Sequence, residues 1–193
     1  MNTIAIFASG KGSNADAICS YFTNHATIKV GCIFSDRKAA GVFDVALKHT
    51  IPSVYITKEL LQSPQQFLSM LNSYNITFIV LAGYLKLMPV EIIAVYKNRI
   101  INIHPALLPK YGGKGMFGMH VHEAVYNAQD KETGITIHQV NEEYDKGAII
   151  FQAKVVLEKT DTPKNISEKI HLLEMLHFPR EIEKVVLGSK IKV

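Results

Sequence analysis

Two polar side chains stand two residues apart in the run Arg99–Pro105. Three isoleucines give this run the character of a β-strand, and residues two apart in a strand project from the same face. Asn102 and His104 should therefore lie side by side, and Pro105, which has no N–H, should end the strand. An Asn amide can donate to a developing oxyanion, and a His can transfer a proton near neutral pH. The alternatives are polar side chains in solvent at a strand end, or a histidine satisfied within the core.

A carboxylate further along the chain could complete this pair. Asp145 lies in a polar loop, residues 141–147, between two stretches that are typical of strands. Its negative charge could orient the His104 imidazole and raise the pKa of that ring by favouring the cation. The alternative is a solvated acid in an acidic turn, because Glu142 and Glu143 stand beside it.

A glycine-rich turn follows the first apolar run. Residues 9–14 read Ser-Gly-Lys-Gly-Ser-Asn, between an expected strand over Ile4–Ala8 and a stretch of helical spacing that ends at Phe22. Backbone N–H groups in such a turn and at the start of a helix can bind a phosphate. The spacing GxxxxGK[ST] is absent, so a Walker A loop is excluded.

The same turn fits a second, looser pattern. Gly10-x-Gly12-x-x-Ala15 matches the dinucleotide fingerprint, and Asp36 ends the second expected strand, where a ribose-binding acid would lie. An NAD-dependent oxidoreductase is therefore a rival hypothesis, and a tight turn that binds nothing is the simplest alternative. A third possibility is a ligand-binding module without catalytic activity.

Several histidines invite comparison with metal sites: His104, His120, His122 and His138. His120 and His122 are two residues apart, which would separate them around a helix. Neither an HExxH motif nor a Cys/His set accompanies them. We therefore expect no metal cofactor.

The composition is that of an ordinary globular protein. The chain has 193 residues, 48% hydrophobic and 20% charged, which is enough apolar material for the core of one domain. The formal net charge of +4 is mild and suits anionic small molecules, whereas a nucleic-acid binder usually shows a denser basic stripe. We therefore expect small-molecule substrates and no nucleic-acid partner.

Cysteine usage and the N-terminal residues indicate a cytoplasmic protein. Cys19 and Cys32 have neither CxxC nor zinc-type spacing, so we expect two small core side chains in a reducing compartment. Residues 1–3 lead into an apolar strand without the basic region or cleavage site of a signal peptide. No apolar run is long enough to span a membrane, so we expect no membrane partner.

Strands and helices alternate in the first half of the chain, which predicts βαβ units and a parallel sheet. Expected strands cover residues 4–8, 28–34, 52–56, 77–81 and 100–104. Expected helices cover residues 15–22, 39–49, 64–74 and 89–96. The loops after the first, fourth and fifth strands should share one edge of the sheet. That edge would bring the glycine turn, Leu85–Met88 and the Asn102/His104 pair to one crevice.

The second half adds a different pattern. Residues 105–118 form a connection rich in Gly, Pro and Lys, with the composition of a mobile flap. A helix over 119–128 precedes an antiparallel hairpin of strands 134–140 and 148–156. Thr162-Pro163 begins a final helix, which Pro179 should kink or break. The prediction is a single domain over residues 1–193, with a Rossmann-like, mostly parallel sheet, helices on both faces and an added C-terminal hairpin.

Five motifs together resemble the glycinamide ribonucleotide transformylases, also called phosphoribosylglycinamide formyltransferases, of the folate-dependent formyltransferase superfamily. They are Gly12-Ser13-Asn14, Gly83–Met88, Asn102–Tyr111, Gly134-x-Thr136-x-His138 and Asp145-x-Gly147. The NIHPxLLPKY run is specific to the superfamily, and the early GSN turn points to the glycinamide branch. Methionyl-tRNA formyltransferase carries a further C-terminal domain and formyltetrahydrofolate deformylase an N-terminal regulatory domain, and we expect neither here.

The resemblance implies roles for individual residues. The substrate phosphate would be held by Gly12, Ser13 and Asn14, and the glycinamide part would contact Glu174. The pterin pocket of the folate would be bordered by Leu85, Lys86, Leu87 and Met88, with Asn102 also at the folate. The catalytic residues would be Asn102, His104 and Asp145.

The same resemblance implies an activity. The family transfers a formyl group from 10-formyltetrahydrofolate, its cosubstrate, to the amine of 5'-phosphoribosylglycinamide in purine biosynthesis. It needs no metal, and we expect a monomer or a homodimer.

Three features depart from the family's pattern. Residues 111–119 are several residues longer than the usual turn. Lys86 stands where Arg is common, and His171 stands where Gln is often found.

Overall fold

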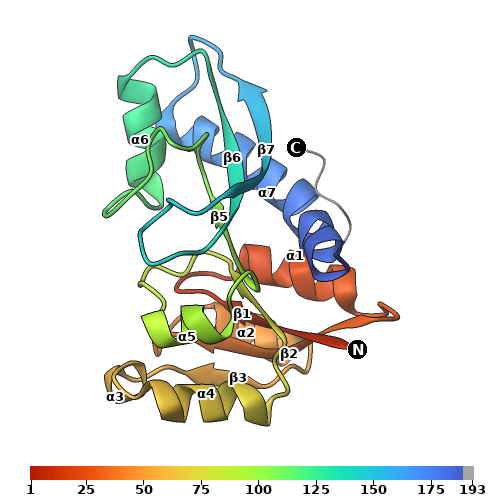
Figure 1. Ribbon diagram of the computed structural model, residues 1–193. Helices are drawn as coiled ribbons and strands as arrows, with labels where there is room; N and C mark the ends of the chain where they lie inside the picture. The colour runs from red at the N-terminus through yellow and green to blue at the C-terminus, as the bar shows by residue number, and fades with distance from the viewer. Residues whose placement is uncertain (189–193) are drawn as a thin grey trace.

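The computed structural model describes residues 1–188 of the chain (Figure 1). Within these residues, seven strands form one sheet in the order β3-β2-β1-β4-β5-β6-β7. The strands are β1 Asn2–Phe7, β2 Ile28–Ser35, β3 Ser53–Tyr55, β4 Phe78–Leu81, β5 Ile100–His104, β6 Glu132–Gln139 and β7 Ile149–Val156. The first five are parallel, and β6 and β7 add an antiparallel pair. The mostly parallel sheet and the C-terminal hairpin are confirmed.

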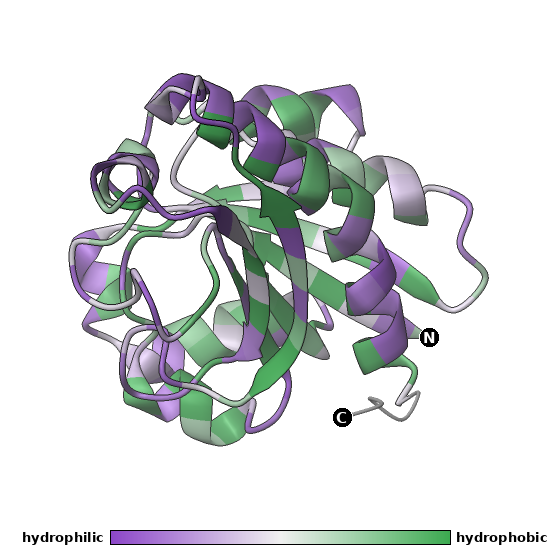
Figure 2. Ribbon diagram, turned by 90° about the horizontal axis from the view of Figure 1, so that it is seen from above, coloured by the Kyte–Doolittle hydropathy of each residue, from purple (hydrophilic) through white to green (hydrophobic). Residues whose placement is uncertain are grey.

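Helices cover both faces of the sheet, as the sequence predicted. They are α1 Ser13–Phe22, α2 Val42–Lys48, α3 Lys58–Leu61, α4 Pro64–Ser73, α5 Val90–Val95, α6 Met119–Asn127 and α7 Pro163–Val186. Alternation along β1 separates the two cores: Ile4 and Ile6 pack with α1, α2 and α7, whereas Ala5 and Phe7 pack with α3, α4 and α5. In Figure 2 the strands are mainly green between helices that carry purple outer sides.

The hairpin fixes what faces the polar end of β5. Strand β5 pairs antiparallel with β6, so that Asn102 lies opposite His138 and His104 lies opposite Thr136. Side chains of directly opposed residues share one face of a sheet. A second polar pair is therefore built beside Asn102 and His104 by strand register alone.

Two local expectations need correction. Helix α7 continues through Pro179 to Val186, so this proline does not break it. The flanking Phe178 and Ile182 are fully buried, and this packing offsets the backbone hydrogen bond that proline removes. The unexpected short helix α3 begins where the Thr57 hydroxyl accepts a hydrogen bond from the Leu60 N–H.

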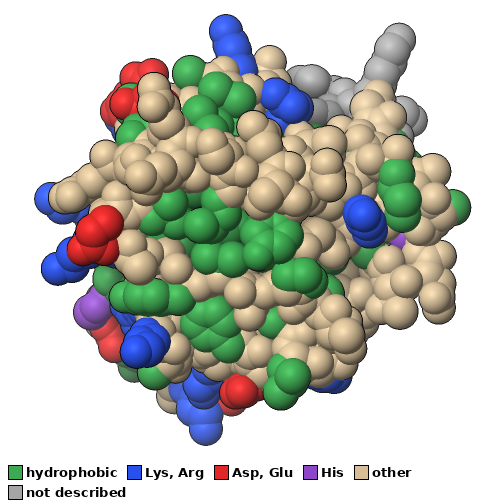
Figure 3. Space-filling model, turned by 90° about the horizontal axis from the view of Figure 1, so that it is seen from below, with side chains coloured by type: hydrophobic (Ala, Val, Ile, Leu, Met, Phe, Trp, Pro, Cys, Tyr) green, Lys and Arg blue, Asp and Glu red, His purple; other side chains and the backbone are tan. Residues whose placement is uncertain are grey.

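The surface of the protein mixes polar and apolar side chains. On the face seen in Figure 3, hydrophobic side chains gather between scattered lysines, arginines and acidic residues. Among residues 1–188, no helix is both long and apolar enough to cross a bilayer. Cys19 and Cys32 are buried free thiols, as expected for small core side chains.

Gly147 lets the loop that carries Asp145 pass close to β6. A Cβ at Gly147 would lie 1.6 Å from the Gln139 carbonyl oxygen, which is backbone and cannot move aside cheaply. We expect Gly147→Ala to lower the free energy of unfolding by roughly 1–3 kcal/mol. Urea denaturation measures this change. Gly10→Ala is the matched control, because nothing lies within 4 Å of its Cβ, and equal stability loss in both variants would contradict the account.

Candidate active site

The predicted site residues all line one cavity of about 540 Å³ at the carboxyl ends of β1, β4 and β5. They are Gly12, Ser13, Asn14, Leu85, Lys86, Leu87, Met88, Asn102, His104, Asp145 and Glu174. A cavity of this volume is within the range of small-molecule sites. The crevice that the sequence predicted at this edge of the sheet is therefore present.

The glycine turn forms one wall of the cavity. Gly12 has φ +85°, and a Cβ there would lie 2.8 Å from the Val42 Cα, so the tight turn requires glycine. No side chain caps the start of α1. Its first N–H groups are thus available to an anion, which fits the predicted phosphate site.

The last helix reaches this turn from the far end of the chain. Asn14 Nδ2 donates to Glu174 Oε2 at 3.0 Å, and His171 Nδ1 lies 3.6 Å from the same oxygen. Glu174 on α7 is thereby placed beside the glycine turn. His171 itself is not among the residues that line the cavity.

The loop after β4 is tied to the same turn through Ser9. The Ser9 hydroxyl donates to Asp36 Oδ1 at 2.5 Å and accepts from the Leu85 N–H at 3.1 Å. Lys86 Nζ lies 4.0 Å from the other Asp36 oxygen. Asp36 therefore holds the loop and the turn together, whereas an NAD site would need this carboxylate free for a ribose.

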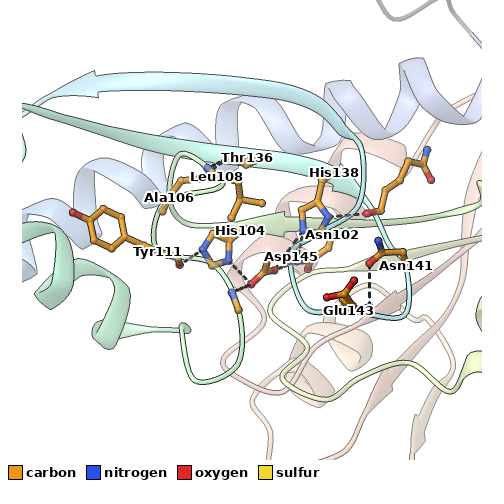
Figure 4. Close-up of polar contacts among 12 residues, drawn as sticks. Asn102, His104, Ala106, Leu108, Tyr111, Thr136, His138, Asn141, Glu143 and Asp145 are labelled. Carbon is orange, nitrogen blue, oxygen red and sulfur yellow. Dashed lines mark hydrogen bonds and ion pairs between the residues drawn. The ribbon is translucent and has the colours of Figure 1, made fainter.

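The Asp145 carboxylate joins Asn102 and His104 (Figure 4). Asn102 Nδ2 lies 3.5 Å from Asp145 Oδ1, and His104 Nδ1 lies 3.5 Å from Asp145 Oδ2. Asp145 adopts φ +57°, a left-handed conformation that Asp tolerates better than most residues. The three predicted residues, separated by up to 43 positions in the chain, form one cluster.

The long glycine-rich connection closes over this cluster. The Tyr111 carbonyl accepts a hydrogen bond from His104 Nε2 at 2.7 Å, and the Gly113 N–H donates to Asp145 Oδ2 at 2.9 Å. A carbonyl can only accept, so Nε2 carries a proton. The beginning of this connection thus orients both His104 and Asp145, a role that its composition did not reveal.

His138 belongs to the cluster, although we did not predict it as a site residue. Its Nδ1–H donates to the Gln139 carbonyl at 2.7 Å, which leaves Nε2 to accept from Asn102 Nδ2 at 3.1 Å. His138 Nε2 also lies 3.5 Å from Asp145 Oδ1. The available signal was the Thr136-x-His138 spacing in a strand next to β5, and reading it requires the strand register.

The protonation states follow from burial. Burial lowers the pKa of the His104 imidazole below its ordinary 6.5, and the Asp145 charge opposes this only in part. Burial acts to raise the pKa of Asp145, but contacts with His138, His104 and the Gly113 N–H outweigh it and lower that pKa. The expected effect of the Asp145 charge, which is to raise the pKa of His104, is present, but burial of the ring outweighs it. Both shifts favour a neutral His104 beside an ionised Asp145.

This geometry suits proton transfer coupled to oxyanion stabilisation. His104 Nδ1 bears the lone pair and faces Asp145, so a proton taken there would be stabilised by the carboxylate. The Asn102 N–H that now lies 3.5 Å from Asp145 is weakly engaged and can donate to an oxyanion instead. Among residues 1–188, no group of three or more His, Cys, Asp or Glu side chains could hold a metal ion.

The sheet is mostly parallel and Rossmann-like, and an amide, an imidazole and a carboxylate meet at its edge. These features define the class of protein. The Formyl transferase family matches residues 2–182, and the chain belongs to this family.

Three similar proteins carry the name phosphoribosylglycinamide formyltransferase. Phosphoribosylglycinamide formyltransferase of Bacillus subtilis (strain 168) is 31% identical over 191 residues, covering 96% of this chain and 95% of that protein. The chloroplastic phosphoribosylglycinamide formyltransferase of Arabidopsis thaliana is 37% identical over 194 residues, and the match spans 96% of this chain but only 64% of that protein. The crystal structure of the Bacillus halodurans phosphoribosylglycinamide formyltransferase superposes with a TM-score of 0.86 at 34% identity, covering 98% of this chain and 97% of that one.

The effects of burial and of the Asp145 charge on the pKa of His104 can be measured directly. We expect its imidazole to titrate with a pKa below 6.5 in NMR spectra, because burial outweighs the Asp145 charge. Since that charge raises the pKa of His104, Asp145→Asn should lower it further. Loss of the resonance in His104→Gln assigns the signal. A pKa above 6.5, or a rise in Asp145→Asn, would contradict the neutral state assigned to this ring.

Proposed function

We propose that the protein transfers a formyl group from 10-formyltetrahydrofolate to the amine of 5'-phosphoribosylglycinamide. The products are 5'-phosphoribosyl-N-formylglycinamide and tetrahydrofolate, in the de novo purine pathway to IMP. One observation carries the proposal: the glycine turn, the Leu85–Met88 loop and the Asn102–His104–Asp145 cluster line a single cavity. The proposal is supported by the names of two relatives that this chain matches over nearly their whole length.

Each wall of the cavity has a role in this proposal. The substrate phosphate binds the turn formed by Gly12, Ser13 and Asn14, and Glu174 binds the part of the substrate beyond it. The folate, which is a cosubstrate rather than a resident cofactor, lies along Leu85, Lys86, Leu87 and Met88, with its formyl group at Asn102. Exposed Leu87 and buried Met88 offer apolar contact to a ring, and the Lys86 ammonium suits an anionic tail.

The bond changes balance within the two substrates. The amine nitrogen attacks the formyl carbon and forms a C–N bond, while the carbonyl oxygen becomes an oxyanion. Asn102 donates to this oxyanion. His104 accepts the proton that the amine loses, Asp145 stabilises the resulting cation, and the proton passes to folate N10 as its C–N bond breaks. The nucleophile belongs to the substrate, so no serine or cysteine nucleophile is required.

The proposal also covers the domain organisation, location and partners of the protein. We take residues 1–193 as a single formyltransferase domain, of which residues 189–193 lie outside the described part. The enzyme acts on small molecules in the cytoplasm, needs no metal, and works as a monomer or a homodimer without nucleic-acid or membrane partners.

The proposal is tested by following folate absorbance with and without 5'-phosphoribosylglycinamide. We expect turnover only when the amine substrate is present. Release of tetrahydrofolate without the amine would instead indicate a deformylase, and no turnover in either case would indicate a binding module. Fluorescence titration with NADH should give no binding, and saturable binding would favour the oxidoreductase.

Alanine variants test the two proposed catalytic side chains. Removing one oxyanion donor typically costs on the order of 10²–10³ in kcat, and a positioned acid or base typically contributes on the order of 10²–10⁴, so we expect Asn102→Ala and His104→Ala each to lose at least about 10². Steady-state kinetics measures it. Asn72→Ala on α4 and His120→Ala on α6 are matched controls with exposed side chains and should keep wild-type kcat. Near-normal turnover by Asn102→Ala or His104→Ala would remove that residue from the mechanism.

A further inference from the structure

A buried histidine that the proposed mechanism does not use also lines the cavity. His122 on α6 is 5% exposed and contributes to the cavity wall. His120, two residues earlier on the same helix, keeps 68% of its side chain exposed and pairs with Glu123. The helix therefore turns one histidine to solvent and the other into the site.

The ring of His122 is incompletely satisfied. Its Nδ1 is buried and has no hydrogen-bond partner within residues 1–188. Buried polar atoms in native proteins nearly always have a partner, and an unpaired acceptor is tolerated better than an unpaired N–H. The proton therefore belongs on Nε2. Because Nδ1 is enclosed, Nε2 is the nitrogen able to reach a molecule in the cavity.

Burial and two neighbouring residues affect the pKa of His122. Burial lowers the pKa of the His122 imidazole, the Glu174 carboxylate acts to raise it, and His104 acts to lower it. Burial is the largest of these effects, so the pKa of His122 lies below its ordinary value. Glu174 contacts Asn14 at the phosphate turn, whereas His104 belongs to the cluster where the formyl group is transferred. Asn14, Glu174 and His104 all line the cavity that contains His122.

We propose that His122 binds the sugar phosphate substrate, its Nε2–H donating to a neutral oxygen between the phosphate and the amine. The acceptor is a ribose oxygen or the amide oxygen, which share the same hydrogen-bonding chemistry. A neutral donor suits such an oxygen, and it adds no positive charge that would repel the attacking amine. This inference rests on the proposed function, because it takes the substrate from that reaction.

The test compares two replacements of His122. His122→Phe keeps an aromatic ring but no donor, so we expect the KM for 5'-phosphoribosylglycinamide to rise about tenfold, the effect of losing one hydrogen bond. The KM for 10-formyltetrahydrofolate should not change. His122→Gln can place an amide N–H near the Nε2 position and should stay within about threefold of wild type. His120→Phe, the same exchange at the exposed site, should change neither KM.

Three results would overturn the inference. The first is an unchanged KM for 5'-phosphoribosylglycinamide in His122→Phe, and the second is an equal rise in the KM values for both substrates. The third is a rise in the KM for 5'-phosphoribosylglycinamide in His122→Gln as large as that in His122→Phe. If His122→Phe does not fold, His122→Asn replaces it, since its shorter amide matches Nδ1 rather than Nε2. His122→Asn should then bind 5'-phosphoribosylglycinamide more weakly than His122→Gln does. Equal affinities of the two variants would overturn the inference.

Calorimetry separates this inference from the proposed function, because binding needs no turnover. Weaker binding of both ribose 5-phosphate and 5'-phosphoribosylglycinamide by His122→Phe identifies a ribose oxygen as acceptor. Weaker binding of 5'-phosphoribosylglycinamide alone identifies the amide oxygen. Unchanged affinity for both in an active enzyme would refute the role of His122 and leave formyl transfer intact. A wild-type protein that binds ribose 5-phosphate through His122 yet transfers no formyl group would refute only the reaction.

Discussion

The Asp145 carboxylate is the constraint on which the site depends. It is largely buried, so its charge must be satisfied by groups brought from other parts of the chain. Strand β5 supplies Asn102 and His104, β6 supplies His138, and the connection after β5 supplies the Gly113 N–H. The Asn102 and Gly113 N–H groups donate to the carboxylate, and the His104 and His138 rings each lie 3.5 Å from it, so one buried charge brings all four groups together.

The sheet makes this convergence possible. Apolar alternation along β1 builds a core on each face and fixes the strands relative to one another. The turns that follow β1 and β4 then meet at Ser9, whose hydroxyl connects Asp36 with the Leu85 N–H. The glycine turn and the Leu85–Met88 loop are thus parts of one hydrogen-bonded unit, and a shift of either would disturb the other.

Burial changes the chemistry that the residue types suggest. An aspartate beside a histidine favours the imidazolium in water, and the sequence supported that interpretation. Within the protein, the cost of burying a charged ring is the larger effect, and it lowers the pKa of His104. Burial also lowers the pKa of His122. Burial therefore works against the cationic form of both rings.

The sequence by itself determined the alternating strands and helices, the glycine turn and the residues of the Asn102–His104–Asp145 cluster, because these depend on local periodicity and on short motifs. Tertiary structure decided the continuity of α7 through Pro179, the contacts of Tyr111 and Gly113, and the place of His138. Each of these depends on packing or strand register between segments far apart in the chain. The degree of burial, which sets the pKa of His104, likewise exists only once those segments are assembled.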